Sequence, residues 1–369
     1  MEEPVPFVDL VAQHAEVAAE VANGLAELFA STAFVGGPAV AAFEAEFARY
    51  VGVSHCVGVG NGTDAIELAL RAVGVGPGDE CVLPANTFVA TAEAVARAGA
   101  RPVLVDCRED TYLMDTDAVA AALTERTRAI LPVHLYGQTV PVERLLPLAE
   151  RVGAVVVEDA AQAQGASRHG VHAGALGQVA ATSFYPGKNL GAYGDAGAVL
   201  TGDGSLAERL RLLRSHGEPR RYDHSVLGFN SRLDSMQAVV LSAKLRRLER
   251  WNAARRAAAA RYHELLAGVD GVVRPVTEEG NEHVWHLYVV RVPDRDLVLK
   301  ALREAGIGAG IHYPTPVHLT GAFESLGYGP GSFPVAERVA GQLLSLPIHP
   351  HLTVDQQELV VAVVAGALR

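Results

Sequence analysis

The residues of this chain best suited to chemistry are a lysine and an aspartate, each at the end of a run of small or apolar residues. Lys188 lies among glycines in the run Ser183-Phe-Tyr-Pro-Gly-Lys-Asn-Leu-Gly-Ala-Tyr-Gly-Asp-Ala-Gly197. Upstream, Asp159 closes the apolar stretch that begins at Ala154. A Schiff-base amine and a carboxylate at the end of a strand are what chemistry on pyridoxal 5'-phosphate (PLP) requires. The pattern predicts Lys188 and Asp159 as catalytic residues, and the alternative for Lys188 is a surface lysine in a glycine-rich loop.

Asp159 and its neighbour Gln162 have the chemistry to bind the ring of that cofactor. An acid at the end of an apolar strand is costly to bury without a cationic partner. A protonated pyridine nitrogen supplies this partner, and the ion pair makes the ring an electron sink. Gln162, three residues further on, is placed to hydrogen-bond the phenolic oxygen. A helix N-cap is the structural alternative for Asp159.

Three further positions are candidates for binding the phosphate and the ring face. The run Gly58-Val-Gly-Asn-Gly-Thr63 offers the backbone N–H groups of Gly62 and Thr63, and the Thr63 hydroxyl, at the positive end of a helix. Ser183, five residues before the lysine, is also placed to bind the phosphate. Phe88 at a loop–helix junction is a candidate to stack on the ring. The alternatives are an ordinary turn with a threonine cap, a turn serine and a core phenylalanine.

The elements that position these residues alternate between short β-branched runs and alanine-rich helical segments. Strands are expected at 57–60, 80–83, 102–105, 129–133 and 154–157, and the first four are each followed by a helix. This alternation predicts a mainly parallel α/β sheet covered on both faces. Ligands are then expected at the loops that follow the carboxyl ends of the strands.

The second half of the chain predicts a smaller domain. One long basic helix over 241–266 is expected to lead into it, followed by a strand at 286–292 and a helix at 296–305. We therefore predict a large PLP-binding domain over residues 1–245 and a small C-terminal domain over 246–369. The 369 residues, 49% of them hydrophobic, are enough to bury a large core.

Composition argues against other classes of partner. The net charge is −11 and the arginines are scattered, which argues against nucleic acid. Cys56, Cys81 and Cys107 have no paired spacing, so no disulfide framework and no metal site are predicted. No run of about 18 apolar residues is present to cross a membrane, and the first residues lack the pattern of a signal peptide. A cytoplasmic location is expected.

Segments along nearly the whole chain resemble the DegT/DnrJ/EryC1/StrS sugar aminotransferases. They are 34–38, 57–64, 84–92, 158–162, 183–197 and 228–238. The resemblance implies the type I fold of PLP-dependent transferases: a mainly parallel seven-stranded sheet between helices, plus a smaller α+β C-terminal domain. The chain departs from the common Gly-Asp-Gly-Gly pattern only at Ala196, a small change that should not disturb the site.

The resemblance also implies roles for individual residues. Asp159, Gln162, Ser183 and Lys188 match the residues that hold PLP in the family. Family members form homodimers with the active site at the interface, where the residue matching Asn230 reaches the phosphate of the neighbouring subunit's cofactor. L-glutamate is the expected amino donor, leaving pyridoxamine 5'-phosphate (PMP). Lys188 then moves the proton between Cα and C4′ in both half-reactions.

The amino acceptor is expected to be a nucleotide-linked ketosugar. The run 184–192, with Gln162 where many relatives carry histidine, is similar to the branch that acts on C3 of 3-keto-6-deoxyhexoses. We therefore predict a dTDP-3-keto sugar aminotransferase of deoxyamino sugar biosynthesis for glycosylated natural products. The alternatives are a 4-ketosugar or keto-cyclitol aminotransferase and, from another class, a non-catalytic regulatory protein with the PLP fold.

Six side chains are candidates for substrate contacts. The segment 310–318 resembles the substrate-side loop of the family, and arginines near position 220 are candidates to clamp a diphosphate. The alternative for each is a solvated surface residue. The candidates are Tyr185, Arg220, Tyr222, His312, Tyr313 and His318.

Overall fold

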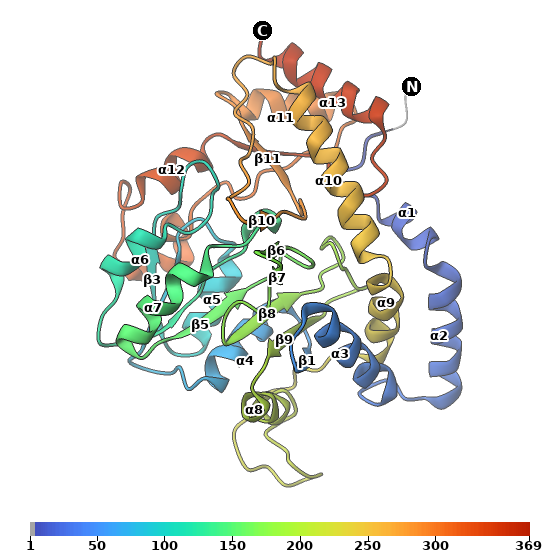
Figure 1. Cartoon of the computed structure of the whole chain (residues 1–369), viewed down its shortest axis with the longest axis vertical. Helices are drawn as coiled ribbons and strands as arrows, with labels where there is room; N and C mark the ends of the chain where they lie inside the picture. Colours follow the sequence, from blue (N-terminus) through green and yellow to red (C-terminus); the bar gives the residue numbers. More distant parts are fainter. Residues whose placement is uncertain (1–3) are drawn as a thin grey trace.

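The β-branched runs of the first half of the chain form a seven-stranded sheet. The computed structural model describes residues 4–369, and the strands lie in the order β1-β9-β8-β5-β4-β2-β3 (Figure 1). β9 is antiparallel to both of its neighbours, and the other pairs are parallel. The predicted mainly parallel sheet is confirmed. The strands are β1 His55–Val59, β2 Glu80–Pro84, β3 Arg101–Val105, β4 Thr127–Ile130, β5 Val155–Asp159, β8 Val179–Ser183 and β9 Gly197–Thr201.

Helices cover both faces of this sheet because alternate residues of each strand point to opposite faces. Cys81 of β2 belongs to the core under α4, α5 and α8, whereas its neighbour Val82 belongs to the core under α6 and α7. A further core packs α3 and α9 against β1, β8 and β9. The helices are α3 Pro38–Val51, α4 Gly62–Ala72, α5 Val89–Arg97, α6 Thr116–Ala122, α7 Val142–Val152, α8 Gly204–Arg214 and α9 Ser235–Leu245.

The C-terminal part builds a second core on an antiparallel strand pair. β11 Tyr288–Arg291 pairs with β12 Leu343–Leu346. Their apolar side chains pack with those of α10 Leu248–Leu265, α11 Arg295–Glu304 and α13 Val354–Ala367. Figure 1 shows α10 running from the region of α9 to this group. Val5 of the N-terminal segment is also buried in this core, so both ends of the chain contribute to it. The predicted boundary at 245/246 falls in the turn between α9 and α10 and stays a prediction.

The expected single helix over 241–266 is wrong, because the structure divides it. α9 ends at Leu245 and α10 begins at Leu248. At the break the N–H of Arg247 bonds the carbonyl of Lys244, three residues back rather than four. Arg246 and Arg247 both turn toward Glu20 of α2 (Ala18–Ser31), and this pairing accompanies the tightened turn.

The remaining elements are short or lie at the periphery. A small three-stranded sheet joins β6 Ser167–Arg168, β7 Val171–His172 and β10 Asn281–Glu282. The remaining helices are α1 Leu10–Ala15, α2 Ala18–Ser31 and α12 Pro334–Ala340, and α12 packs on the core under α4, α5 and α8. Turns of 3-10 helix lie at Leu135–Gly137, Val317–Leu319 and Gly321–Leu326.

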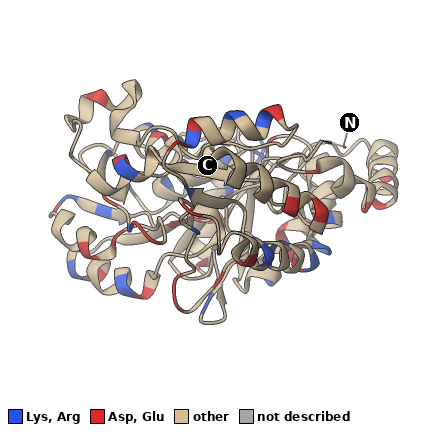
Figure 2. Ribbon diagram, turned by 90° about the horizontal axis from the view of Figure 1, so that it is seen from above, with Lys and Arg blue, Asp and Glu red and all other residues tan. Residues whose placement is uncertain are grey.

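The described residues show no membrane-spanning helix, no disulfide and no metal-binding group. Basic and acidic residues are interspersed along the helices of the ribbon in Figure 2. Within residues 4–369, no helix has the length and apolar character needed to cross a membrane. The three cysteines are buried and unpaired. The same residues contain no group of His, Cys, Asp and Glu side chains arranged to hold a metal ion.

Candidate active site

The candidate site is a cavity of about 820 Å³ at the edge of the sheet where β1, β2, β5 and β8 end. The position is the one expected for ligands of a parallel sheet. Side chains from the C-terminal part and the N-terminal segment close the other side of it. Ten of the fourteen predicted site residues line this cavity: Gly62, Thr63, Phe88, Asp159, Gln162, Ser183, Tyr185, Lys188, His312 and Tyr313.

Lys188 presents an amine to this cavity from the loop between β8 and β9. The N–H of Lys188 bonds the carbonyl of Tyr185 at 2.8 Å, which fixes the turn that carries it. Its Nζ makes no hydrogen bond with any other residue in the range 4–369. Burial lowers the pKa of Lys188 to about 8, although the nearby Asp159 acts in the opposite direction. A substantial share of the amine is therefore neutral at mildly alkaline pH, and only the neutral amine is a nucleophile.

Asp159 ends β5 with its carboxylate facing the same cavity. The residue is only 5% exposed. Oδ2 accepts a hydrogen bond from the Thr91 hydroxyl at 2.7 Å, and Oδ1 accepts one from the N–H of Ala161 at 3.1 Å. Both donors are neutral, and none of the ion pairs among the described residues involves this carboxylate. A buried anion in this state fits a cationic ligand, such as a protonated pyridine nitrogen.

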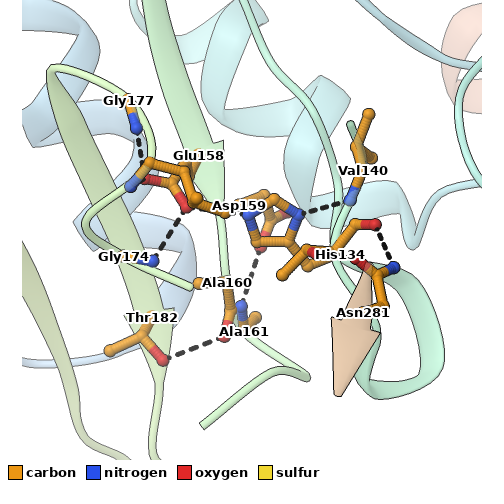
Figure 3. Close-up of polar contacts among 12 residues, drawn as sticks. His134, Val140, Glu158, Asp159, Ala160, Ala161, Gly174, Gly177, Thr182 and Asn281 are labelled. Carbon is orange, nitrogen blue, oxygen red and sulfur yellow. Dashed lines mark hydrogen bonds and ion pairs between the residues drawn. The ribbon is translucent and has the colours of Figure 1, made fainter. Parts of the chain in front are cut away.

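The strand that carries Asp159 is fixed from the opposite face by its neighbour Glu158. Glu158 and His134 are fully buried, and Nε2 of His134 lies 2.8 Å from Oε2 of Glu158. The Glu158 carboxylate also accepts backbone N–H bonds from Gly174 and Gly177 at 2.8 and 2.7 Å, as Figure 3 shows. Because successive side chains of a strand alternate between faces, this network holds β5 without contacting the cavity.

Gln162 connects two tyrosines, Tyr136 and Tyr313, by hydrogen bonds. Its Oε1 accepts the N–H of Tyr136 at 2.6 Å, and its Nε2 donates to the hydroxyl of Tyr313 at 2.9 Å. The predicted donor is therefore present, and in this structure it is directed to a phenol of the cavity wall. Burial raises the pKa of that Tyr313 hydroxyl, so it stays protonated. The Tyr313 ring lies 5.2 Å from the ring of Phe88.

Phe88 is a cavity residue and not part of the core. Its side chain is 49% exposed, and it precedes the first turn of α5 in an extended conformation. An aromatic ring exposed to a cavity that also holds Asp159 and Lys188 is placed to stack on a flat ligand. This position excludes the alternative of an ordinary core phenylalanine.

Gly62, Thr63 and Ser183 meet where the start of α4 approaches the end of β8. Asn61, not Thr63, caps the helix, because its side chain accepts the N–H of Asp64 at 2.8 Å. The Thr63 hydroxyl is thus left to the cavity. A Cβ on Gly62 would lie 2.6 Å from Cβ of Ser183, so glycine allows the close approach. Backbone N–H groups at the positive end of α4 beside a serine hydroxyl form a cradle that fits a phosphate.

Three predicted residues lie on or after an exposed loop that follows α8 and do not line the cavity of their own chain. Figure 1 shows this loop extending away from the sheet. Tyr222 is 78% exposed, Arg220 is also exposed, and Oδ1 of Asn230 accepts a hydrogen bond from Arg232 at 3.1 Å. Their predicted contacts with substrate and cofactor therefore stay predictions.

The structure does not support His318 as a substrate contact. Its side chain is fully buried, with Nε2 2.9 Å from a carboxylate oxygen of Glu337. The ring also packs edge-on against Phe333 at 4.8 Å. This imidazole is held by a carboxylate and an aromatic ring on the side of α12, outside the cavity.

Two residues of the cavity, His286 and Thr91, were not predicted from the sequence because long-range contacts place them there. His286 lines the cavity next to Lys188, and Thr91 donates to Asp159. His286 precedes β11, and in the sequence it appears only as the first residue of a strand. Thr91 lies four residues beyond Thr87, and their hydroxyls are 2.7 Å apart, which is a helical spacing that could have drawn attention to it.

The sequence of this chain is similar to those of known aminotransferases along nearly its whole length. The profile of the DegT/DnrJ/EryC1/StrS aminotransferase family matches residues 15–365. The dTDP-3-amino-3,4,6-trideoxy-alpha-D-glucose transaminase of Streptomyces venezuelae is 50% identical over 348 residues, covering 94% of this chain and 92% of that protein. The erythromycin biosynthesis sensory transduction protein EryC1 of Saccharopolyspora erythraea is 49% identical over 364 residues, covering 98% of this chain and 100% of that protein.

The fold comparison agrees with the sequence comparison. The crystal structure of S. venezuelae DesV in complex with a ketimine intermediate has a TM-score of 0.97, 49% identity and 99% coverage of both chains. Structures that resemble this chain include both PLP and PMP forms, and PLP is the cofactor that the cavity residues fit. Because the family profile spans residues 15–365 and relatives about 50% identical cover more than nine tenths of the sequence, the chain belongs to the DegT/DnrJ/EryC1/StrS aminotransferase family.

Proposed function

We propose that this protein transfers the amino group of L-glutamate, by way of PLP, to C3 of a dTDP-linked 3-keto-6-deoxyhexose. The observation that carries the proposal is that Lys188 and Asp159 face one cavity, and that neither has an ionic partner among the described residues. Two opposite charges that are kept apart in a partly closed site leave room for a ligand between them. The names of relatives about 50% identical to this chain, which are dTDP-3-amino sugar transaminases, support the choice of acceptor.

The protein's contribution is to hold the cofactor and to move a proton. Bound PLP supplies an electron sink for the carbon that gains or loses the amine. Asp159 pairs with the ring nitrogen and keeps it protonated, while Ser183, Gly62 and Thr63 bind the phosphate. The released amine of Lys188 then removes a proton from one carbon and returns it to another, as general base and acid.

The part of the cavity that is not needed for the cofactor is available to the sugar. Tyr185, His312 and Tyr313 line it with hydroxyl and imidazole groups that bind sugar hydroxyls. Burial lowers the pKa of His312 to about 4, and the nearby Lys188 lowers it further in the same direction. The ring is thus neutral at neutral pH, and its Nδ1 lies 2.8 Å from the hydroxyl of Ser345. A neutral imidazole suits an uncharged hydroxyl ligand.

A homodimer with shared active sites completes the proposal. The loop after α8 exposes apolar side chains that a lone chain would leave in water: Leu227 is 92% exposed and Val226 is 47% exposed. Exposed apolar residues grouped on one segment favour a protein interface. Such an interface would bring Asn230 and Arg220 to the cavity of the partner, where they are expected to meet the phosphate and the diphosphate.

The test of the reaction starts from enzyme converted to the PMP form with L-glutamate and then desalted. Addition of a dTDP-3-keto-6-deoxyhexose should restore the yellow absorption of the PLP-loaded enzyme. If L-glutamate bleaches this absorption but the 3-ketosugar does not restore it, the acceptor moves to a 4-ketosugar or a keto-cyclitol. A dTDP-4-keto-6-deoxyhexose added in parallel separates these outcomes.

A regulatory protein is the second candidate, and the name of one relative favours it. EryC1 of Saccharopolyspora erythraea carries the name of a sensory transduction protein. A regulator that only bound PLP would need neither a free lysine amine nor an acid that keeps the ring protonated, and this chain has both. A cofactor that L-glutamate and other amino donors fail to bleach would favour the regulatory function.

A further inference from the structure

His286 lies on the cavity wall and has no part in the reaction proposed above. It precedes β11, and its side chain is partly open to the cavity that holds Lys188. Its chain neighbour Leu287 also lines the cavity, whereas Trp285 on the other side belongs to the second core. An imidazole in this position can contact the groups that react, so its protonation state matters.

A chain of hydrogen bonds determines which nitrogen of His286 carries the proton. Asn252 donates through Nδ2 to the carbonyl of Gln164 at 2.9 Å, so its Oδ1 is left as an acceptor. Asn189 donates through Nδ2 to that Oδ1 at 2.9 Å and to the carbonyl of Val284 at 3.0 Å. Oδ1 of Asn189 therefore points to Nδ1 of His286, 3.2 Å away. An amide oxygen can only accept, so Nδ1 of His286 must be the donor.

The other nitrogen, Nε2, then carries a lone pair. Burial lowers the pKa of His286 well below its ordinary value, and the surrounding positive groups, Lys188 first, lower it further. The other groups near the ring are Arg255, His312 and His283. None of these is an acid, so the ring stays neutral over the working pH range with Nε2 as an acceptor. Lys188, the first of these charged groups, lines the same cavity and carries N–H donors on its amine.

We propose that Nε2 of His286 accepts a hydrogen bond from the amine of Lys188 whenever that amine is not bonded to the cofactor. His286 is thus a positioning residue, and the inference rests on the proposed aminotransferase function. Lys188 and Asn189 are adjacent in the chain, so the loop that carries the amine also orients the imidazole. The side chain of lysine is long and flexible, so its amine can move away from the reacting carbon between two proton transfers. An acceptor that holds the amine in place keeps the proton transfer fast.

Two substitutions separate this role from a purely structural one. The amide of glutamine occupies roughly the place of Nε2, and the amide of asparagine roughly that of Nδ1. His286→Gln keeps an acceptor toward Lys188 but loses the contact with Asn189. His286→Asn keeps a donor toward Asn189 but loses the acceptor in the cavity. Thermal unfolding and PLP content of both variants show whether the site is intact.

The first measurement is the rate at which L-glutamate bleaches the PLP-loaded enzyme. We expect His286→Asn to be about 100-fold slower than the parent, and His286→Gln to be within about tenfold of it. With α-deuterated glutamate, the isotope effect should rise in His286→Asn, because proton transfer becomes more strongly rate-limiting. If His286→Asn is the faster variant, the histidine serves only to hold Asn189 and the proposal is overturned.

The second measurement does not depend on turnover. PLP is added to cofactor-free enzyme, and the rate of Schiff-base formation is followed against pH. An acceptor stabilises the ammonium form, so its loss should shift the midpoint for Lys188 to lower pH in His286→Asn but not in His286→Gln. Equal midpoints in all three proteins would overturn the proposal. If L-glutamate fails to bleach even the parent enzyme, the proposed function fails, while this titration still decides the role of His286.

Discussion

At the scale of single residues, the site is defined by charges that lack partners. Asp159 is buried with neutral donors only, and Lys188 is enclosed with no hydrogen bond from its amine to the rest of the described chain. Two buried cations outside the cavity, Lys244 and Arg255, are held by carbonyl acceptors: Lys244 donates to the carbonyl of Gly191 at 2.7 Å and Arg255 to that of Ile348 at 2.8 Å. Among the described residues, Lys188 lacks even such a bond and Asp159 has neutral donors only, so a bound cofactor that contacts both should raise the free energy of unfolding.

Lys188→Ala should abolish transamination and leave the fold intact. The substitution removes the amine that binds the cofactor and moves the proton, and no other lysine lines the cavity. Without cofactor, the variant should unfold at an equal or higher temperature than the parent, because an enclosed cation without a partner is removed. Turnover of the ketosugar and thermal unfolding of the cofactor-free proteins check both parts. Substantial residual transamination would contradict the assigned role.

Asp159→Asn should slow both half-reactions by about 100-fold or more, because the ring nitrogen loses the charge that keeps it protonated. Thr91→Val removes only the hydroxyl that donates to Asp159 at 2.7 Å, so its effect should be about tenfold. Single-turnover rates with L-glutamate, at equal PLP content, provide the comparison. Equal rates in parent and Asp159→Asn would show that the carboxylate does not act on the ring.

The sequence predicted the residues whose chemistry is local and missed those whose role depends on distant contacts. Lys188, Asp159 and Gln162 were found because each lies in a short segment with a clear chemical pattern. The hydrogen bond between His286 and Asn189 joins residues 97 positions apart, so no local sequence pattern predicts it. For His318 the deciding partner is Glu337, 19 residues later, which turns a candidate sugar ligand into a packing contact.

At the scale of elements, the approach of α4 to the end of β8 makes the phosphate cradle. The predicted strands overlap β1 to β5, most closely at β2 and β3 and least at β4, but β8 and β9, which flank the lysine loop, were not predicted. Val-Ala-Ala-Thr-Ser in β8 contains two alanines, which favour helix, so local propensity points away from a strand. Burial on both faces between β5 and β9 overrides that preference.

Gly62→Ala tests this approach directly. A Cβ at this position would lie 2.6 Å from Cβ of Ser183, which forces α4 and β8 apart and disturbs the cradle. Overpacking of this kind costs about 1–3 kcal/mol, so PLP should bind about tenfold more weakly or worse. Gly76→Ala is the matched control, because no atom lies within 4 Å of the added Cβ. Fluorescence titration of the cofactor-free proteins gives both affinities, and equal values would show that α4 can yield.

At the scale of the whole molecule, the cavity lies between the seven-stranded sheet and the C-terminal part of the chain. One side of it is not covered by the described residues. The residues predicted to be catalytic lie at the end of β5 and in the loop after β8, and the C-terminal part of the chain supplies His286, His312 and Tyr313. The loop after α8 carries Asn230 and reaches no part of this cavity. The placement of that loop was the least predictable feature, because the proposed contact with a second subunit leaves no trace in the hydrogen bonds of one chain. A direct test must therefore use two chains.

Mixing two inactive variants tests whether subunits share sites. Lys188→Ala lacks the amine, and Asn230→Asp should repel the cofactor's phosphate in the neighbouring subunit, so each homodimer should be inactive. In a hybrid dimer one site carries both defects, while the other combines an intact Lys188 with an intact Asn230. Random exchange makes about half of the dimers hybrids with one working site each, so activity should return to about a quarter of the parent level. A mixture that stays inactive after exchange, although mass spectrometry detects the hybrid, would mean that Asn230 serves its own chain.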